Sequence, residues 1–153
     1  MEESYSDQFY AALATVRFGE PTPMRGEFTE AQWALLAAWG RAGYGTGMHP
    51  PCDALPDDLL RLWAPHLLIF HRADAGWERR SVGSAALWLL GKGQTWASLP
   101  AAVRVLAELA AAAGRPSLQR LPNWLATGND LSVLILPLGE KRADQLLIAA
   151  YSI

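Results

Sequence analysis

Residues Leu60–Gly91 read LRLWAPHLLIFHRADAGWERRSVGSAALWLLG, and this stretch decides the expected fold. Two runs with the composition of strands, His66–Phe70 and Trp77–Val82, flank a short segment that is suited to a turn. Gly83-Ser84 then interrupts the pattern, and the Ala-, Leu- and Trp-rich residues after it are typical of a short helix. The segment therefore predicts strand, turn, strand and helix, with the Trp and Leu side chains of the helix facing a sheet.

The composition indicates one folded domain. The chain has 153 residues, of which 51% are hydrophobic and 18% are charged, so it can bury a core. The net charge is −2 and no Lys/Arg cluster is longer than a pair, which argues against nucleic acid as a partner. A single cysteine, an acidic start and no apolar run of the roughly 20 residues that a membrane span needs favour a cytoplasmic protein.

The first residues are expected to form a helical flank, residues 1–28, ahead of the main domain, residues 29–153. Four apolar residues recur there at helical spacing, namely Tyr5, Phe9, Leu13 and Val16. This stripe must be buried somewhere, either against a second copy of the chain or against the protein's own sheet. We expect a homodimer, because burying four such side chains at about 1.5–3 kcal/mol each can offset the entropy of association.

The main domain is expected to begin with a capped helix. Thr29 and Gln32 have the spacing of a capping box, in which each side chain binds the backbone N–H of the other residue. The helix should end at Gly40, and Arg41–Pro56 should form a surface loop that is rich in Gly and Pro. Asp57 or Asp58 can then cap a short helix that stops before Pro65.

The remaining pattern predicts an α+β fold: a five-stranded antiparallel sheet with short helices on one face. The two strands of the opening segment should cover about residues 66–72 and 77–83, joined by a hairpin turn. A longer helix, Ala101–Ala113, should end at Gly114, since Pro116 cannot continue it. Three further strands are expected at about residues 117–125, 131–138 and 145–153.

No pattern in the sequence favours a metal site or a catalytic nucleophile. His49, Cys52, His66 and His71 lack the CxxC, HxxxH or HExxH spacing of metal ligands. Ser84 is not part of a GxSxG elbow, and Cys52 has no activating base beyond a nearby histidine. The glycine-rich segment 43–47 follows a helix rather than a strand, so we interpret it as a loop and not as a phosphate cradle.

Seven tryptophans allow either core packing or ligand stacking. Trp33, Trp39 and Trp63 lie on helical segments and are expected to be structural, whereas Trp88 and Trp124 could line an interior pocket. Helical spacing and strand alternation predict that nine apolar side chains converge between the helices and the inner face of the sheet. They are Leu87, Trp88, Val105, Leu106, Leu109, Trp124, Leu134, Leu136 and Ile148.

The order of these elements resembles a PAS domain, and more narrowly the single-domain PAS family of alphaproteobacteria. Five short motifs carry the resemblance: Leu55-Pro56 with Leu59–Leu67, Arg79–Ser84, Leu89–Gly91, Gly114–Pro116 and Leu134–Leu138. The chain departs from the family pattern at Gly93–Trp96 and in its last hairpin turn, Gly139–Arg142.

The resemblance implies a non-catalytic module of signal transduction, which senses a small apolar metabolite or contacts a signalling protein. Haem-binding members carry a histidine on the long helix and flavin photoreceptors an Asn-Cys-Arg motif, neither of which matches Ala101–Ala113 or Cys52. We therefore expect no cofactor. Two alternatives remain: a small enzyme or carrier that uses the same apolar pocket, and a domain whose interior is plain core and whose surface makes the contacts.

Overall fold

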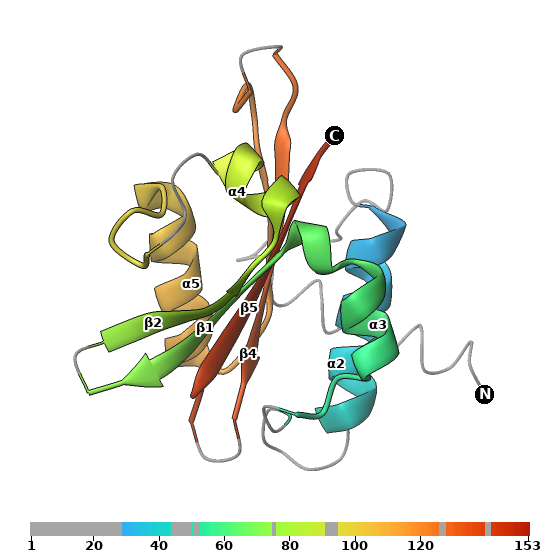
Figure 1. The fold of residues 1–153 in the computed structure, drawn as a ribbon, viewed down its shortest axis with the longest axis vertical. Helices are drawn as coiled ribbons and strands as arrows, with labels where there is room; N and C mark the ends of the chain where they lie inside the picture. Colours follow the sequence, from blue (N-terminus) through green and yellow to red (C-terminus); the bar gives the residue numbers. More distant parts are fainter. Residues whose placement is uncertain are drawn as a thin grey trace.

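A computed structural model describes residues 29–43, 50, 53–74, 76–90, 95–125, 128–139 and 142–153 of the chain (Figure 1). The elements are the helices α2 (Glu30–Gly43), α3 (Asp57–Leu62), α4 (Ser84–Leu90) and α5 (Ala101–Ala113), a 3₁₀ turn η2 (Ala64–His66), and the strands β1 (Leu67–Ala73), β2 (Gly76–Val82), β3 (Ser117–Leu121), β4 (Leu131–Leu138) and β5 (Gln145–Ser152). The helical flank predicted over residues 1–28, with its stripe Tyr5, Phe9, Leu13 and Val16, lies outside the described residues, as do His49 and Cys52.

The five strands form one antiparallel sheet in the order β2-β1-β5-β4-β3, so the first strand pairs with the last in the middle of the sheet. The expected α+β fold with a five-stranded antiparallel sheet is confirmed. A β-bulge interrupts the first hairpin: Ile69 faces Ser81 and Phe70 faces Arg79, which leaves Arg80 as the extra residue.

The helices cover both faces of the sheet, and not one face as the sequence predicted. Figure 1 shows α2 and α3 on one side of the strands and α5 and α4 on the other. Every residue of β4, Leu131–Leu138, is buried, and β5 is buried except for its last residue, Ser152. A continuous apolar run of this kind, without alternation, is the pattern of a strand that is covered on both faces.

Helix α2 begins with the capping box that the sequence predicted. The backbone N–H of Thr29 donates to Oε1 of Gln32 over 3.0 Å, and the backbone N–H of Gln32 donates to Oγ1 of Thr29 over 3.2 Å. The helix continues past its expected end at Gly40 to Gly43. Helix α3 begins at Asp57 after Pro56, without the side-chain cap that Asp57 or Asp58 was expected to supply.

In the second half of the chain, α5, β4 and β5 follow the predicted boundaries closely. Helix α5 has its expected limits, and Gly114 adopts the left-handed conformation (φ 66°) with its N–H donating to the carbonyl of Ala110. Strand β3 is shorter than predicted and ends at Leu121. Pro122 cannot donate to a ladder and Asn123 has a positive φ of 51°, so the chain turns there.

Gly83 allows the backbone of η2 to pass close to the start of α4. The N–H of Gly83 donates to the carbonyl of Leu67 over 2.7 Å, just before α4 begins. A Cβ atom at this position would lie 2.2 Å from the carbonyl oxygen of Ala64 and 2.3 Å from that of Pro65. The backbone of η2 therefore passes so close to the start of α4 that only glycine fits without a shift.

Candidate functional site: the Trp77–Trp96 pocket

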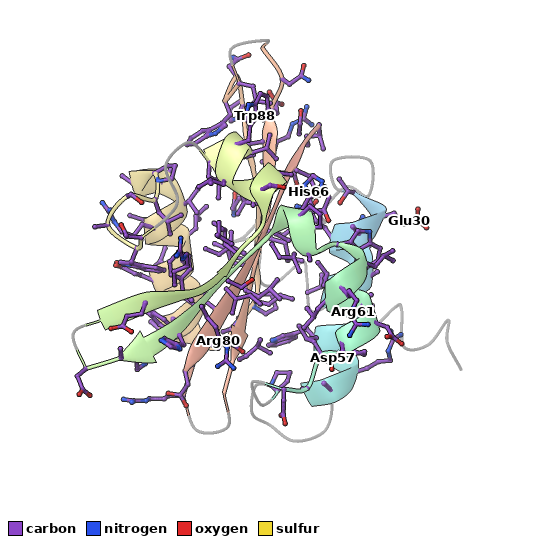
Figure 2. All side chains as sticks on the ribbon, viewed as in Figure 1. Glu30, Asp57, Arg61, His66, Arg80 and Trp88 are labelled. Atoms are coloured by element: carbon purple, nitrogen blue, oxygen red, sulfur yellow. The ribbon has the colours of Figure 1, made fainter. Side chains whose placement is uncertain are left out.

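The structure does not bring the nine predicted pocket residues together. Three of them project into solvent, with exposed fractions of 75% for Trp88, 54% for Val105 and 49% for Leu109. Figure 2 shows Trp88 on the outer side of α4. On α5 the buried positions are Val103, Ala107 and Ala110, a stripe that lies on the other side of the helix from Val105.

Two more of the nine lie on the opposite face of the sheet. Leu134 and Leu136 pack against the α2 side, whereas Ile148 packs on the α4–α5 side. The reason is register: Ile148 pairs directly with Ile135, so Ile135 shares its face and the two neighbours of Ile135 point away. Periodicity within one strand assigns its two faces but does not say which face meets which helix.

The other predicted residues are placed on or near the expected side. Leu106, Trp124 and Ile148 belong to the apolar cluster between the sheet and α4–α5, and Leu87 is half-buried on α4. Small side chains line the helices there, and they bring the backbone of α5 close to the strands. The helix residues of this cluster that are fully buried are Ala86, Val103 and Ala107.

Trp124 fastens the β3–β4 connection to α4. Its indole Nε1–H donates to the carbonyl of Leu89 over 3.0 Å. The connection is itself braced, because Asp130 accepts from Nε of Arg120 at 2.5 Å and from the backbone N–H of Asn123 at 2.9 Å. These two contacts, the backbone N–H first and the guanidinium second, lower the pKa of the Asp130 carboxyl. Trp124 therefore has a structural role, because it holds the β3–β4 connection against α4.

A pocket of about 360 Å³ opens at the margin of the α4–α5 layer, next to edge strand β2. We call it the Trp77–Trp96 pocket; its lining residues are Trp77, Glu78, Arg79, Thr95 and Trp96. The two indole rings pack against each other, with centroids 5.6 Å apart and planes tilted by 31°. Both side chains are half-buried, so each ring keeps part of its surface open to solvent.

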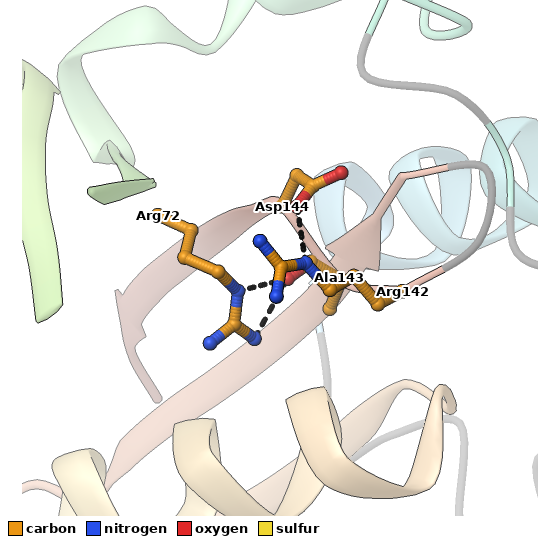
Figure 3. A network of polar contacts seen from close by, with 4 residues as sticks. All are labelled: Arg72, Arg142, Ala143 and Asp144. Atoms are coloured by element: carbon orange, nitrogen blue, oxygen red, sulfur yellow. Dashed lines mark hydrogen bonds and ion pairs between the residues drawn. The ribbon is translucent and has the colours of Figure 1, made fainter. Parts of the chain in front are cut away.

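The two rings are held from behind by residues of β1. The ring of Phe70 meets that of Trp96 edge to face, at 5.3 Å and 80°. The guanidinium of Arg72 lies 4.6 Å from the ring centroid of Trp77, a cation–π contact. Arg72 is itself fixed, since its Nε and Nη2 both donate to the carbonyl of Ala143, over 3.0 and 2.9 Å (Figure 3). These contacts hold both indole rings in the positions that form the aromatic wall of the pocket.

The turn that carries Trp96 is also braced. The backbone N–H of Thr95 donates to Oγ of Ser98 over 2.9 Å, and the backbone N–H of Ser98 donates to Oγ1 of Thr95 over 3.2 Å. The Ser98 hydroxyl donates in turn to the carbonyl of Thr95. Such reciprocal bonds fix the turn in the way that a capping box fixes the start of a helix. They leave the Thr95 hydroxyl hydrogen without an acceptor among the described residues.

The charge facing the pocket is positive. Arg79 lies opposite Phe70 in the first hairpin, so it shares the face of the two indole rings. Glu78 points to the other face, where its Oε2 lies 3.4 Å from Nε2 of His71. Within the described part of the chain, Arg79 forms no ion pair and no hydrogen bond through its guanidinium.

Sequence reasoning assigned no role to Trp77, Arg79 or Trp96. The first hairpin does carry a signal for Trp77 and Arg79, since they alternate along a strand and must share one face. Thr95 and Ser98 have the spacing of a capped turn, which would have marked the segment around Trp96 as ordered. Only the fold brings this turn beside β2.

A second hollow, of about 400 Å³, lies on the other side of the sheet, between α3 and the first hairpin. Its lining residues are Asp57, Leu60, Arg61, Ala64, Leu67, Ile69 and Ser81. Asp57 and Arg61, labelled in Figure 2, are one helical turn apart and carry opposite charges. The groove therefore presents no net charge and no pair of aromatic rings, and it is the weaker candidate for a small-molecule site.

A buried polar cluster joins α2 to the sheet. Gln32 is fully buried; its Nε2 donates to the carbonyls of Ser132 (3.0 Å) and Ala149 (3.3 Å), and its Oε1 accepts from the Ser132 hydroxyl (2.8 Å). Nearby, the ring of Tyr151 stacks on that of His66 with centroids 4.2 Å apart. Burial raises the pKa of the Tyr151 hydroxyl to about 12. These groups are held within the core by hydrogen bonds and ring stacking.

The described residues contain no candidate metal site and no candidate membrane span. Among them, no three His, Cys, Asp or Glu side chains gather as metal ligands would. Within the same part of the chain, each helix is too short or too polar to traverse a lipid bilayer.

Comparison of the chain with protein families, with curated proteins and with solved structures gives no match. The fold and the pocket are therefore the observations on which a function can be argued.

Proposed function

We propose that this protein is a PAS-like module of signal transduction in the cytoplasm, which binds a small molecule and passes the signal on by association with another protein. The observation that carries the proposal is the arrangement of the sheet. The first and last strands pair at its centre, and the connection from β2 to β3 runs through α4 and α5 across one face. Two strands, short helices, a longer helix and three strands are the order on which the resemblance to PAS domains rests.

The Trp77–Trp96 pocket supports the sensing part of this proposal. It opens at the edge of the helical layer that the resemblance implies for ligand binding, and its volume of about 360 Å³ is in the range of small-molecule sites. The pocket residues come from the β1–β2 hairpin and from the turn before α5. A ligand that contacts both would stabilise their present relative position, which is a means of fixing the surface that a partner contacts.

A small enzyme or carrier is the second candidate. An enzyme site needs several ionisable groups that converge on one point, as general acid, base or nucleophile. In the pocket described here Arg79 is the one ionised side chain that faces the cavity, because the Glu78 carboxylate is directed to His71. A guanidinium holds its proton throughout the physiological range and serves binding better than proton transfer. This favours the non-catalytic proposal.

Native mass spectrometry of the purified full-length chain tests the sensing function. A small molecule that stays bound in the gas phase and is lost after partial unfolding and refolding would support it. If the mass equals that of the bare chain, and a screen of metabolites changes neither the melting temperature nor the binding of any partner protein, the sensing proposal fails.

We further propose that the chain forms a homodimer through the apolar stripe Tyr5, Phe9, Leu13 and Val16 of the first residues. The support is the spacing of these residues in the sequence, since they lie outside the described part of the chain. Removal of residues 1–20 should convert a dimer into a monomer in sedimentation experiments. A full-length chain that sediments as a monomer at high micromolar concentration would end this proposal.

A further inference from the structure

We infer that the Trp77–Trp96 pocket takes a planar aromatic anion, a one- or two-ring carboxylate, with the ring plane stacked on the indoles and the anionic group held by Arg79. This inference rests on the proposed function, since it names the ligand class of a sensor. It departs from the apolar metabolite that the sequence suggested, because the cavity lies beside a charged edge strand rather than inside the apolar core.

The shape of the pocket selects a flat ligand. The two indole rings, tilted by 31° against each other, each keep part of their surface open to solvent, and an aromatic ring can lie on this aromatic wall with far more contact than an aliphatic chain. One face of Trp77 is already occupied by the guanidinium of Arg72, so a ligand must use the remaining ring surface of this wall. A volume of about 360 Å³ is near the lower limit of ligand sites and suits a ligand of one or two fused rings.

The electrostatics select an anion. Arg79 reaches the pocket from the face of β2 that also carries Trp77, and no carboxylate of the described residues neutralises it. The Thr95 hydroxyl accepts from the Ser98 N–H and keeps its own hydrogen for donation. A guanidinium and a hydroxyl on the two sides of one cavity form a donor pair that suits a carboxylate.

The rigidity of the site favours binding. Phe70 and the fixed guanidinium of Arg72 hold the indoles, and the Thr95–Ser98 bonds hold the turn. A ligand therefore does not have to order the pocket, and little of its contact energy is lost to side-chain entropy.

Indole-3-carboxylate is the probe for this inference, with indole as the planar but uncharged control and cyclohexanecarboxylate as the charged but non-planar one. Titration of the full-length chain is followed through the indole N–H signals in ¹⁵N–¹H spectra. The variants Trp77→Phe and Trp96→Phe each remove one signal and so assign it. We expect both signals to move with indole-3-carboxylate. The signals of Trp39 and Trp124, whose N–H groups donate to the carbonyls of Pro137 and Leu89, should stay in place.

The matched variants are Arg79→Gln and Arg80→Gln, two neighbouring exposed arginines of which only the first lines the pocket. Arg79→Gln should weaken binding of indole-3-carboxylate about tenfold, since it removes a charge-assisted hydrogen bond, and should leave the binding of indole almost unchanged. Arg80→Gln should change neither. Because both side chains are exposed, neither variant should disturb folding.

Equal effects of the two arginine variants would overturn the anion assignment. Trp77 and Trp96 signals that stay in place at millimolar probe would overturn the site itself. These failures are distinct from failure of the proposed function. A co-purified molecule in a chain whose pocket signals do not respond would leave the sensor proposal standing and place its ligand elsewhere.

Discussion

On the α2 side of the sheet a helix is attached by hydrogen bonds, whereas on the α5 side a helix is attached by the close approach of small side chains. Gln32 of α2 bonds to two strands through its amide group, in a site where it is fully buried. Ala107 and Ala110 of α5 present almost nothing but a methyl group to the strands. Hydrogen bonds from a buried side chain fix a helix because they are directional. Small side chains fix it because they let the helix approach the strands closely. The two faces should therefore respond to opposite kinds of substitution.

The largest loss of stability is expected at Gly83, where the backbone of η2 passes the start of α4. The added methyl group of Gly83→Ala would lie within 2.4 Å of backbone atoms of Ala64 and Pro65, which belong to η2 and cannot rotate away. We expect the free energy of unfolding to fall by about 3 kcal/mol. Chemical denaturation measures it, and Ser84→Ala, an exposed neighbour, should change it by less than about 0.5 kcal/mol. An unchanged midpoint for Gly83→Ala would show that η2 and α4 move apart freely.

On the α5 side, a larger side chain at the helix–sheet interface should destabilise the protein. Ala107 is fully buried between α5 and the strands, so Ala107→Leu would overpack the interface. We expect a loss of about 2 to 3 kcal/mol in the free energy of unfolding. Ala112→Leu, at an exposed position of the same helix, is the matched control and should be close to neutral. If both variants were equally stable, the close approach of this helix would not be what holds it.

On the α2 side, replacement of the buried polar side chain by an apolar one should destabilise the protein. Gln32→Leu keeps most of the side-chain volume but leaves the Ser132 hydroxyl and two carbonyl groups with fewer partners. We expect a loss of about 2 kcal/mol in the free energy of unfolding. The double variant Gln32→Leu/Ser132→Ala should recover part of this loss, because both members of one hydrogen bond are then apolar. Additive losses in that double-mutant cycle would contradict the role of the cluster as a unit.

The smallest change in stability is expected when one unpaired hydroxyl group is removed on each face of the sheet. The hydroxyl groups of Tyr151, on the α2 side, and Ser117, on the α5 side, are buried without a hydrogen-bond partner. Tyr151→Phe keeps the stacking on His66, and it should raise the free energy of unfolding by up to about 1 kcal/mol. Ser117→Ala should be neutral or slightly stabilising for the same reason. A clear loss in either variant would mean that the hydroxyl has a partner.

Tyr151 also predicts how stability depends on alkaline pH. Burial raises the pKa of its hydroxyl from 10.0 to about 12, so the folded protein holds this proton more tightly than the unfolded chain does. The contribution is fully present below about pH 10, the pKa of an unperturbed tyrosine, and is lost as the pH rises toward 12. Denaturation at pH 9 and at pH 11 should show a smaller decrease for Tyr151→Phe than for the natural chain.

Local signals in the sequence were sufficient for the individual elements. The reciprocal Thr29–Gln32 pair started α2, Gly114 with Pro116 ended α5, and the two apolar runs of the opening segment became β1 and β2 within a residue of their expected limits. Each of these features is decided by residues within about one turn of one another, and propensity, capping and alternation act at that range. Trp33, Trp39 and Trp63 likewise pack on the core as their helical positions predicted.

The tertiary structure alone decided which faces meet. Helical spacing could not tell whether Val105 or Ala107 faces the strands, because α5 is apolar on both sides. Strand alternation could not tell that Leu134 points to α2 and Ile135 to α5, because β4 is apolar throughout. The Trp77–Trp96 pocket was also not predicted from the sequence. Its two walls are separated in the sequence by a whole helix, and only the packing of that helix brings them together.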